Sequence, residues 1–225
     1  MTSTNKTIDL RDTEQLIDTA EQRRLMYLIL SRLFFVELSA EQLDEMRLDT
    51  LFDYEHFEEF SELLHKSDTE TIRRELAADF AALFLGLSAH PIAPYESVYT
   101  SEGKLLMQEA RDAVVEVYQR EGLRLSELEG ANLLPEDHIS FELEYMATLC
   151  QDTAIHFKSN DEAEEIRSLK KQLAFLEDHI LRWVPRLCND VSLRARTSFY
   201  RGVSAMTIAY FEEEKEYLKE VLSNY

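Results

Sequence analysis

Residues that end helices or close turns are scarce in this sequence, which has five glycines and four prolines among 225 residues. It also has only two cysteines, Cys150 and Cys188, which lie in separate segments and form no C-x-x-C pair. We therefore expect neither a disulfide framework nor a thiolate zinc site, and both cysteines are predicted to be buried free thiols. No stretch alternates apolar and polar residues long enough to compete with the helical patterns, so the sequence predicts an all-α fold.

Basic side chains are also few, because 24 Lys and Arg stand against 44 Asp and Glu, which gives a net charge of −20. This charge repels phosphate backbones and anionic lipid headgroups, so we expect no nucleic-acid partner and no membrane-surface role. The longest run without a polar residue, Phe80 to Leu87, is far shorter than the roughly 18 residues of a membrane-spanning helix. Residues 1–11 show no basic start followed by an apolar stretch, so no membrane insertion or export is expected, and a cytoplasmic protein is predicted.

Motifs that support catalysis are missing as well. The sequence has no G-x-x-x-x-G-K-[ST] loop, no G-x-G-x-x-G turn and no G-x-S-x-G elbow. A carboxylate-bridged metal centre would need two Glu-x-x-His motifs on neighbouring helices, and the chain lacks such a pair. Asp53 and His56 have the same spacing, but one such pair cannot complete a site. We therefore predict a protein that is not an enzyme and needs neither a cofactor nor a metal.

Apolar residues recur at helical spacing along most of the chain. This periodicity predicts a single bundle-like domain of about eight to ten helices. The expected helices cover residues 12–37, 40–47, 51–64, 72–86, 101–120, 135–156, 166–187 and 191–222. Pro185 is predicted to end one helix, and the prolines of residues 88–100 are predicted to keep that connection non-helical.

Residues 122–134 hold two of the five glycines and are a candidate hinge between two lobes of the single domain 1–225. The larger lobe would cover about residues 12–121 and the smaller one about 135–225. Exchange of lobes through such a hinge would give a domain-swapped dimer, so both a monomer and this dimer remain open.

Two segments stand out because their composition is unusual for connections. The first, Ala93–Tyr99, places two tyrosines beside a proline, and the second, Leu134–His138, combines a proline with an acidic residue and a histidine at a helix start. Each segment has two explanations. The tyrosines either pack under the bundle or contact a partner, and Asp137 either caps a helix or binds a ligand.

Three patterns occur in a fixed order: Glu-Leu-Ala-Ala-Asp-Phe-x-x-Leu-Phe-Leu at 75–85, Pro-Tyr-x-Ser-x-Tyr at 94–99, and Pro-x-Asp-His at 135–138. This ordered set resembles the TorD/DmsD family of cytoplasmic chaperones that mature molybdenum-containing oxidoreductases. The resemblance covers most of the chain and is densest between Glu75 and Leu149. It implies an all-helical protein that recognises the twin-arginine signal peptide and the body of a molybdoenzyme precursor and assists loading of the molybdopterin cofactor before export.

A receptor for such a peptide needs an apolar groove with acidic groups at its rim. We expect Phe80, Leu83 and Phe84 to form the groove wall. The acidic groups expected to meet the two arginines are Asp79, Glu96, Asp137 and Glu142. The remaining candidate residues are expected to form a lip and to orient the peptide: Pro94, Tyr95, Ser97, Val98, Tyr99, Pro135 and His138.

Two other functions compete with the chaperone. One is a helical structural adaptor that binds no signal peptide and packs Tyr95 and Tyr99 inward. The other is the carboxylate-bridged metal protein, against which the missing pair of Glu-x-x-His motifs already counts.

Overall fold

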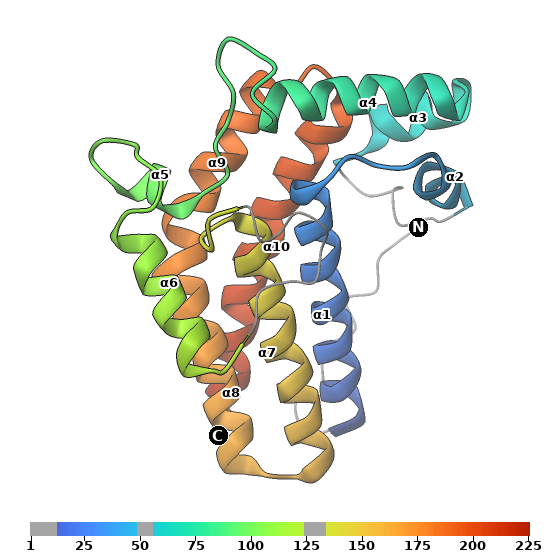
Figure 1. Ribbon diagram of the computed structural model, residues 1–225. Helices are drawn as coiled ribbons and strands as arrows, with labels where there is room; N and C mark the ends of the chain where they lie inside the picture. The colour runs from blue at the N-terminus through green and yellow to red at the C-terminus, as the bar shows by residue number, and fades with distance from the viewer. Residues whose placement is uncertain (1–12, 49–55, 124–133) are drawn as a thin grey trace.

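The computed structural model describes residues 13–48, 56–123 and 134–225 of the chain (Figure 1). Within these residues every regular element is helical, and the one strand-like pairing is an isolated bridge between Tyr95 and His138. The prediction of an all-α fold is confirmed. The helices are α1 (Thr13–Phe35), α2 (Ala40–Leu48), α3 (Glu58–Lys66), α4 (Thr69–Phe84), α5 (Glu96–Thr100), α6 (Glu109–Arg120), α7 (Ile139–Ser159), α8 (Glu162–Phe175), α9 (Leu181–Arg194) and α10 (Ser198–Leu222).

The long helices α1, α7, α8, α9 and α10 run along the length of the molecule, and α4 crosses one end of them (Figure 1). Helices α1 and α7 are antiparallel neighbours and make the most extensive contact in the structure (Figure 1). Tyr27, Leu30 and Phe34 on α1 and Leu143 and Met146 on α7 are all buried. Their spacing of three and four residues places each set on one helix face, and removing these faces from water stabilises the bundle.

The end of α4 agrees with the sequence prediction. Gly86 has a φ of +76°, a conformation that glycine adopts at little cost, and the Leu87 amide donates back to the Ala81 carbonyl at 3.2 Å. Among the helices that the structure describes, none is long and apolar enough to cross a membrane.

The prediction that Pro185 ends a helix is wrong. Helix α8 continues through a π-helical turn, Leu176–Ile180, into α9, and Pro185 lies inside α9. Proline lacks the amide that would bond to the Leu181 carbonyl, and the π-helical turn ends one residue before that carbonyl, where the regular ladder is already interrupted. The last helix therefore begins at Ser198 instead of the predicted residue 191.

The predicted helix 101–120 is shorter than expected, and the predicted non-helical connection 88–100 contains the short helix α5. Lys104 and Met107 both have positive φ values, 52° and 58°, and such residues interrupt a right-handed helix. Helix α6 therefore starts only at Glu109. Residues 51–55 of the predicted helix 51–64 and most of the predicted hinge 122–134 lie outside the described residues.

A buried polar network ties three long helices together. Arg23 on α1 contacts both carboxylate oxygens of Glu214 on α10, at 2.7 and 2.8 Å, and donates to Gln172 on α8. The Tyr27 hydroxyl donates to the same carboxylate at 2.8 Å. Since Arg23 and Glu214 are both almost fully buried, each charge depends on the other for compensation.

We predict that Arg23→Met lowers the free energy of unfolding by about 3 to 5 kcal/mol, because it leaves the Glu214 charge buried without its partner. Urea denaturation of Arg23→Met, Glu214→Leu and the double variant Arg23→Met/Glu214→Leu measures the coupling free energy between the two side chains. The double variant should recover at least half of the single loss. A double variant as unstable as the sum of both single variants would contradict this assignment.

Candidate functional site

The two unusual segments of the sequence lie against each other. The Glu96 amide donates to the Asp137 carbonyl at 3.0 Å, and the Ile139 amide donates to the Pro94 carbonyl at 3.0 Å. Tyr95 and His138 form the isolated antiparallel bridge between these bonds. We call this unit, residues 94–97 with residues 137–139, the junction. It joins the loop after α4 to the first turn of α7, although some forty residues of chain separate them.

Asp137 holds the junction through its side chain as well as its backbone. Its carboxylate is fully buried, and Oδ2 accepts a hydrogen bond from the Ser97 amide at 2.8 Å. Ser97 lies in the first turn of α5, where the amides have no partner within the helix. Asp137 thus caps α5 from a distant part of the chain, whereas the capping expected from the sequence was of the helix that Asp137 precedes.

Two more buried acids lie at the junction. Glu96 Oε2 is 2.8 Å from His179 Nδ1, and Glu142 Oε2 accepts a hydrogen bond from the Trp183 indole at 3.1 Å. Burial, and then the nearby charge of Glu96, raises the pKa of Glu142 well above its ordinary value, whereas the Trp183 bond acts to lower it. A raised pKa favours the protonated form of Glu142, which reduces the negative charge that the interior must hold.

Each of these three carboxyl groups has a second oxygen with no hydrogen-bond partner among the described residues: Glu96 Oε1, Asp137 Oδ1 and Glu142 Oε1. The Ser97 and Tyr118 hydroxyl oxygens are likewise buried without a partner there. Burial and the charge of Glu142 raise the pKa of Tyr118. Five of the eight unpartnered buried polar atoms found in the described part of the chain therefore belong to residues at or beside the junction.

The loop tyrosines are half-buried and anchored on both sides. The Tyr95 ring meets the His138 ring edge to face at 5.0 Å. The Tyr99 hydroxyl donates to Asp190 at 3.0 Å, and the Tyr99 ring packs on Trp183 at 5.6 Å. Both rings keep one side toward solvent, as do Val98 and Pro135, so the junction has an aromatic outer surface with acidic groups behind it.

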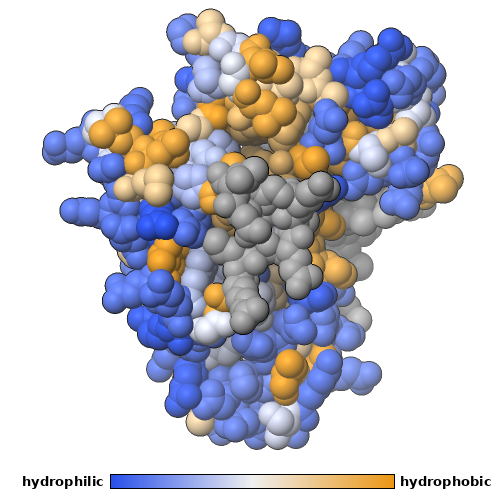
Figure 2. Space-filling model, viewed as in Figure 1, coloured by the Kyte–Doolittle hydropathy of each residue, from blue (hydrophilic) through white to orange (hydrophobic). Residues whose placement is uncertain are grey.

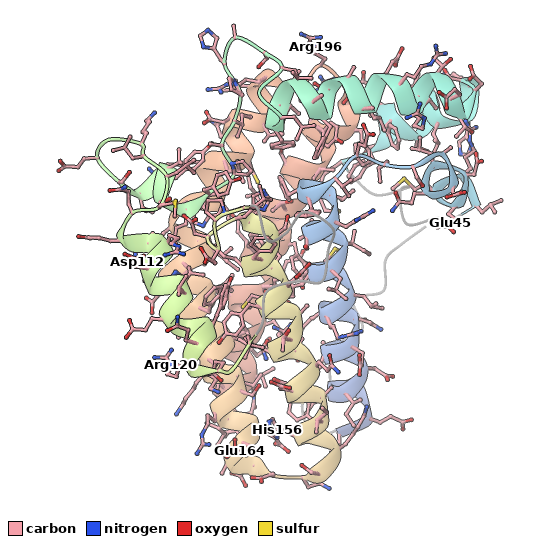
Figure 3. All side chains as sticks on the ribbon, in the orientation of Figure 1. Glu45, Asp112, Arg120, His156, Glu164 and Arg196 are labelled. Atoms are coloured by element: carbon pink, nitrogen blue, oxygen red, sulfur yellow. The ribbon has the colours of Figure 1, made fainter. Side chains whose placement is uncertain are left out.

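The prediction that four acidic residues lie at the exposed rim of a groove is wrong. Asp79, Glu96, Asp137 and Glu142 are all buried, and each carboxyl group has a hydrogen-bond partner within the fold. Asp79 is the clearest case, since its Oδ2 accepts from the Thr197 amide and hydroxyl at 2.8 and 2.7 Å. It therefore caps α10 at the end of the molecule where Figure 3 labels the neighbouring Arg196.

The expected groove wall is also misplaced. Phe80 and Leu83 are buried in the core and Phe84 is packed against it, so these side chains do not line an open groove. Phe80 and Phe84 contact Tyr200 on α10, at ring distances of 6.1 and 6.2 Å. Apolar residues at helical spacing here form core, which is the commoner outcome for such a pattern.

His179, Trp183 and Tyr118 are parts of the site that the sequence interpretation missed. His179 and Trp183 lie in the strongly periodic segment 166–187, where nothing distinguishes them from other residues of an amphipathic helix. A lone tryptophan and a histidine four residues apart on one helix face were the available signal. Nothing in the sequence indicates that they pair with Glu142 and Glu96.

No three His, Cys, Asp or Glu side chains in residues 13–48, 56–123 and 134–225 are grouped so that they could hold a metal ion. One Glu-x-x-His motif does occur, Glu62–His65 on α3, but Glu62 is exposed and pairs with Lys66 at 2.7 Å. Asp53 lies outside the described residues.

Comparisons with known proteins place this chain in a family. The family model described as nitrate reductase delta subunit matches residues 49–189. A "Chaperone protein TorD" from Vibrio atlanticus is 31% identical over 217 residues, which cover 88% of this chain and 95% of that protein. The chain belongs to the TorD family of chaperones. The matched region contains the whole junction, and the expectation that the protein is not an enzyme is confirmed, since these relatives are named chaperones.

Two further TorD chaperones show similar coverage. The one from Photobacterium profundum is 27% identical and covers 91% of this chain, and the one from Vibrio cholerae strain O395 is 29% identical and covers 90%. Each alignment spans at least 94% of the relative's own length, so the likeness extends over whole chains rather than one motif.

His138 gives a pH prediction for this TorD-family chain. Burial lowers the pKa of His138 to about 3, and its Nδ1 accepts a hydrogen bond from the Ser140 amide at 3.2 Å, which requires the neutral ring. In the unfolded chain histidine gains its proton near pH 6.5, so the unfolded state binds more protons below that pH. This contribution to stability is present above pH 6.5 and is lost as the pH falls, by roughly 2 kcal/mol at pH 5.

The matched variant is His138→Asn, because asparagine also accepts at a helix N-cap but does not titrate. Chemical denaturation between pH 5 and pH 8 should give a shallower loss of stability on the acid side for this variant. Equal slopes for the variant and the unmodified protein would contradict a buried neutral His138.

Proposed function

We propose that this TorD-family chaperone binds the twin-arginine signal peptide of a molybdoenzyme precursor in the cytoplasm and assists insertion of its molybdopterin cofactor before export. One observation carries the proposal: the Pro-Tyr-x-Ser and Pro-x-Asp-His segments, which carry the family resemblance, form a single unit at the junction. The two segments pack against each other, and Glu96, Asp137 and Glu142 beside them each have one carboxyl oxygen without a partner among the described residues. This arrangement favours a shared binding role for the two segments over separate structural roles.

The placement of charge suits a cationic peptide. Tyr95 of the junction and the following Val98 and Tyr99 are partly exposed, whereas Asp137 and Glu96 of the junction are buried. A carboxylate surrounded by apolar atoms is poorly screened, so its field reaches the aromatic surface more strongly than that of a solvated acid. We propose that peptide arginines dock on this face, where aromatic rings also attract guanidinium groups.

Calorimetric titration with a synthetic twin-arginine signal peptide tests this proposal. The matched variants are Asp137→Asn, which removes one negative charge at the junction, and Glu45→Gln, which removes one from α2, on another side of the molecule (Figure 3). We expect Asp137→Asn to weaken binding at least about tenfold, or roughly 1.4 kcal/mol, and Glu45→Gln to leave it within about twofold. Binding should also weaken as salt is raised.

A peptide whose two arginines are replaced by glutamine serves as the second control. Equal affinity for both peptides, or equal loss in both protein variants, would contradict a role for the junction charge. If no signal peptide bound the folded protein at all, the adaptor alternative would be favoured.

A further inference from the structure

A patch of exposed apolar side chains lies in the loop that follows α5 and is not part of the hydrophobic core. Leu105, Leu106 and Met107 are 58%, 45% and 59% exposed, and they follow one another in the loop between α5 and α6. Figure 2 shows hydrophobic surface gathered over this loop, which projects from the body of the molecule. Contiguous exposed apolar residues of this size mark interaction sites more often than single exposed leucines do.

The loop is held in a defined shape that presents these side chains outward. The Leu105 amide donates to the Ser101 hydroxyl at 3.1 Å, and the Gln108 side chain donates to the Leu106 carbonyl at 2.9 Å. A Cβ atom at residue 103 would lie 3.2 Å from Leu105 Cγ, so the glycine there makes room for the leucine. The apolar exposure therefore belongs to a structured loop.

The backbone of this loop is unusual. Three residues other than glycine have positive φ in the described part of the chain, and two of them, Lys104 and Met107, enclose the two leucines. Residues rarely adopt this conformation unless the surroundings impose it, and such positions gather at binding sites. The positive φ values and the exposed apolar side chains thus occur in the same four residues, 104–107.

A cavity of about 590 Å³ opens at the base of the loop. Its walls include Thr100 and Ser101 at the end of α5, Glu102, Glu109 on α6, and Arg182 on α9. Glu102 and Glu109 form no ion pair within the described residues, so two carboxylates remain available beside the apolar patch. The cavity volume is within the range of small-ligand and side-chain pockets.

Charge selects one occupant for this surface. A second copy of the chain and an anionic bilayer both carry negative charge, and the net charge of −20 repels each of them. A peptide with an apolar stretch and a cationic end matches both the leucines and the two free carboxylates. The loop also begins where α5 ends, and the five residues of α5 span only about 8 Å, so the loop starts close to the junction.

We propose that Leu105, Leu106 and Met107, with the cavity at their base, dock the apolar segment of a cationic, apolar peptide whose charged end reaches the junction. The inference rests on the proposed function and assigns the apolar part of the same ligand to a surface different from the buried Phe80 and Leu83. It makes residues 105–107 the determinants of preference for apolar sequence in the peptide.

The test uses a triple variant, Leu105→Ser/Leu106→Ser/Met107→Ser, and a matched control, Leu85→Ser/Leu87→Ser/Leu193→Ser, whose leucines are 61%, 75% and 76% exposed. Both are titrated with a synthetic twin-arginine signal peptide and with the same peptide carrying serine in place of its apolar residues. We expect the 105–107 variant to bind the full peptide at least tenfold more weakly, and the control to match the unmodified protein. The serine-substituted peptide should bind all three proteins equally.

A second measurement is independent of affinity. Since Cys150 and Cys188 are buried, an environment-sensitive dye can be attached selectively to Leu106→Cys or to Leu87→Cys. Peptide addition should shift the emission of the dye at residue 106 to shorter wavelength and leave that at residue 87 unchanged.

The outcomes separate the two claims. If the unmodified protein binds the peptide and the 105–107 variant binds it equally well, the location proposed here is wrong and the proposed function stands. If the unmodified protein binds no signal peptide, both fall. If the 105–107 variant changes the sedimentation of a dimer instead of the peptide affinity, the patch is an interface between copies, which also overturns the inference.

Discussion

Three carboxyl groups removed from water connect the parts of the candidate site: Asp137 holds the loop after α4 against the start of α7, and Glu96 and Glu142 join this unit to His179 and Trp183. Burying a carboxylate is unfavourable unless hydrogen bonds or protonation compensate for the lost water. Here hydrogen bonds compensate each of the three groups only in part. One oxygen of each group is bonded and the other has no partner among the described residues. The surrounding helices provide the partner of the bonded oxygen in each group.

Helices from distant parts of the chain supply these donors. The Ser97 amide comes from α5, His179 from the π-helical turn and Trp183 from α9. A π-helical turn adds a residue to the ladder and so changes the direction of the side chains that follow it. In this chain the turn lies where His179 and Trp183 face the junction, which links an irregularity in the longest helical segment to the candidate site.

The chain could be recognised as all-helical from its sequence because helical periodicity is a local property. Gly86 indicated the end of α4, and Pro135 indicated the start of α7. The π-helical turn has no such signal, so the helix through Pro185 was missed. The loop 101–108 was predicted as helix, because the positive φ values at Lys104 and Met107 that interrupt it have no local signal in the sequence.

The sequence drew attention to the two segments of the junction but did not reveal how they are arranged. Ordered motifs identified residues 94–99 and 135–138, and the structure brings them together. Acidic side chains are usually exposed, so Asp79 and Glu142 were expected at a rim. Asp79 instead accepts a hydrogen bond from Thr197, 118 positions later in the sequence and directly before α10, and no local pattern reveals such a partner. Pairings of this kind depend on the tertiary fold alone.

The central claim is that the two segments of the junction form one cooperative unit. Native-state hydrogen exchange measures this directly through the amides of Glu96, Ser97 and Ile139, which bond across the junction. We predict that the three amides exchange with the same opening free energy, and that Asp137→Asn lowers it for all three together. Exchange of the Ile139 amide at an unchanged rate while the Glu96 and Ser97 amides become unprotected would contradict the account.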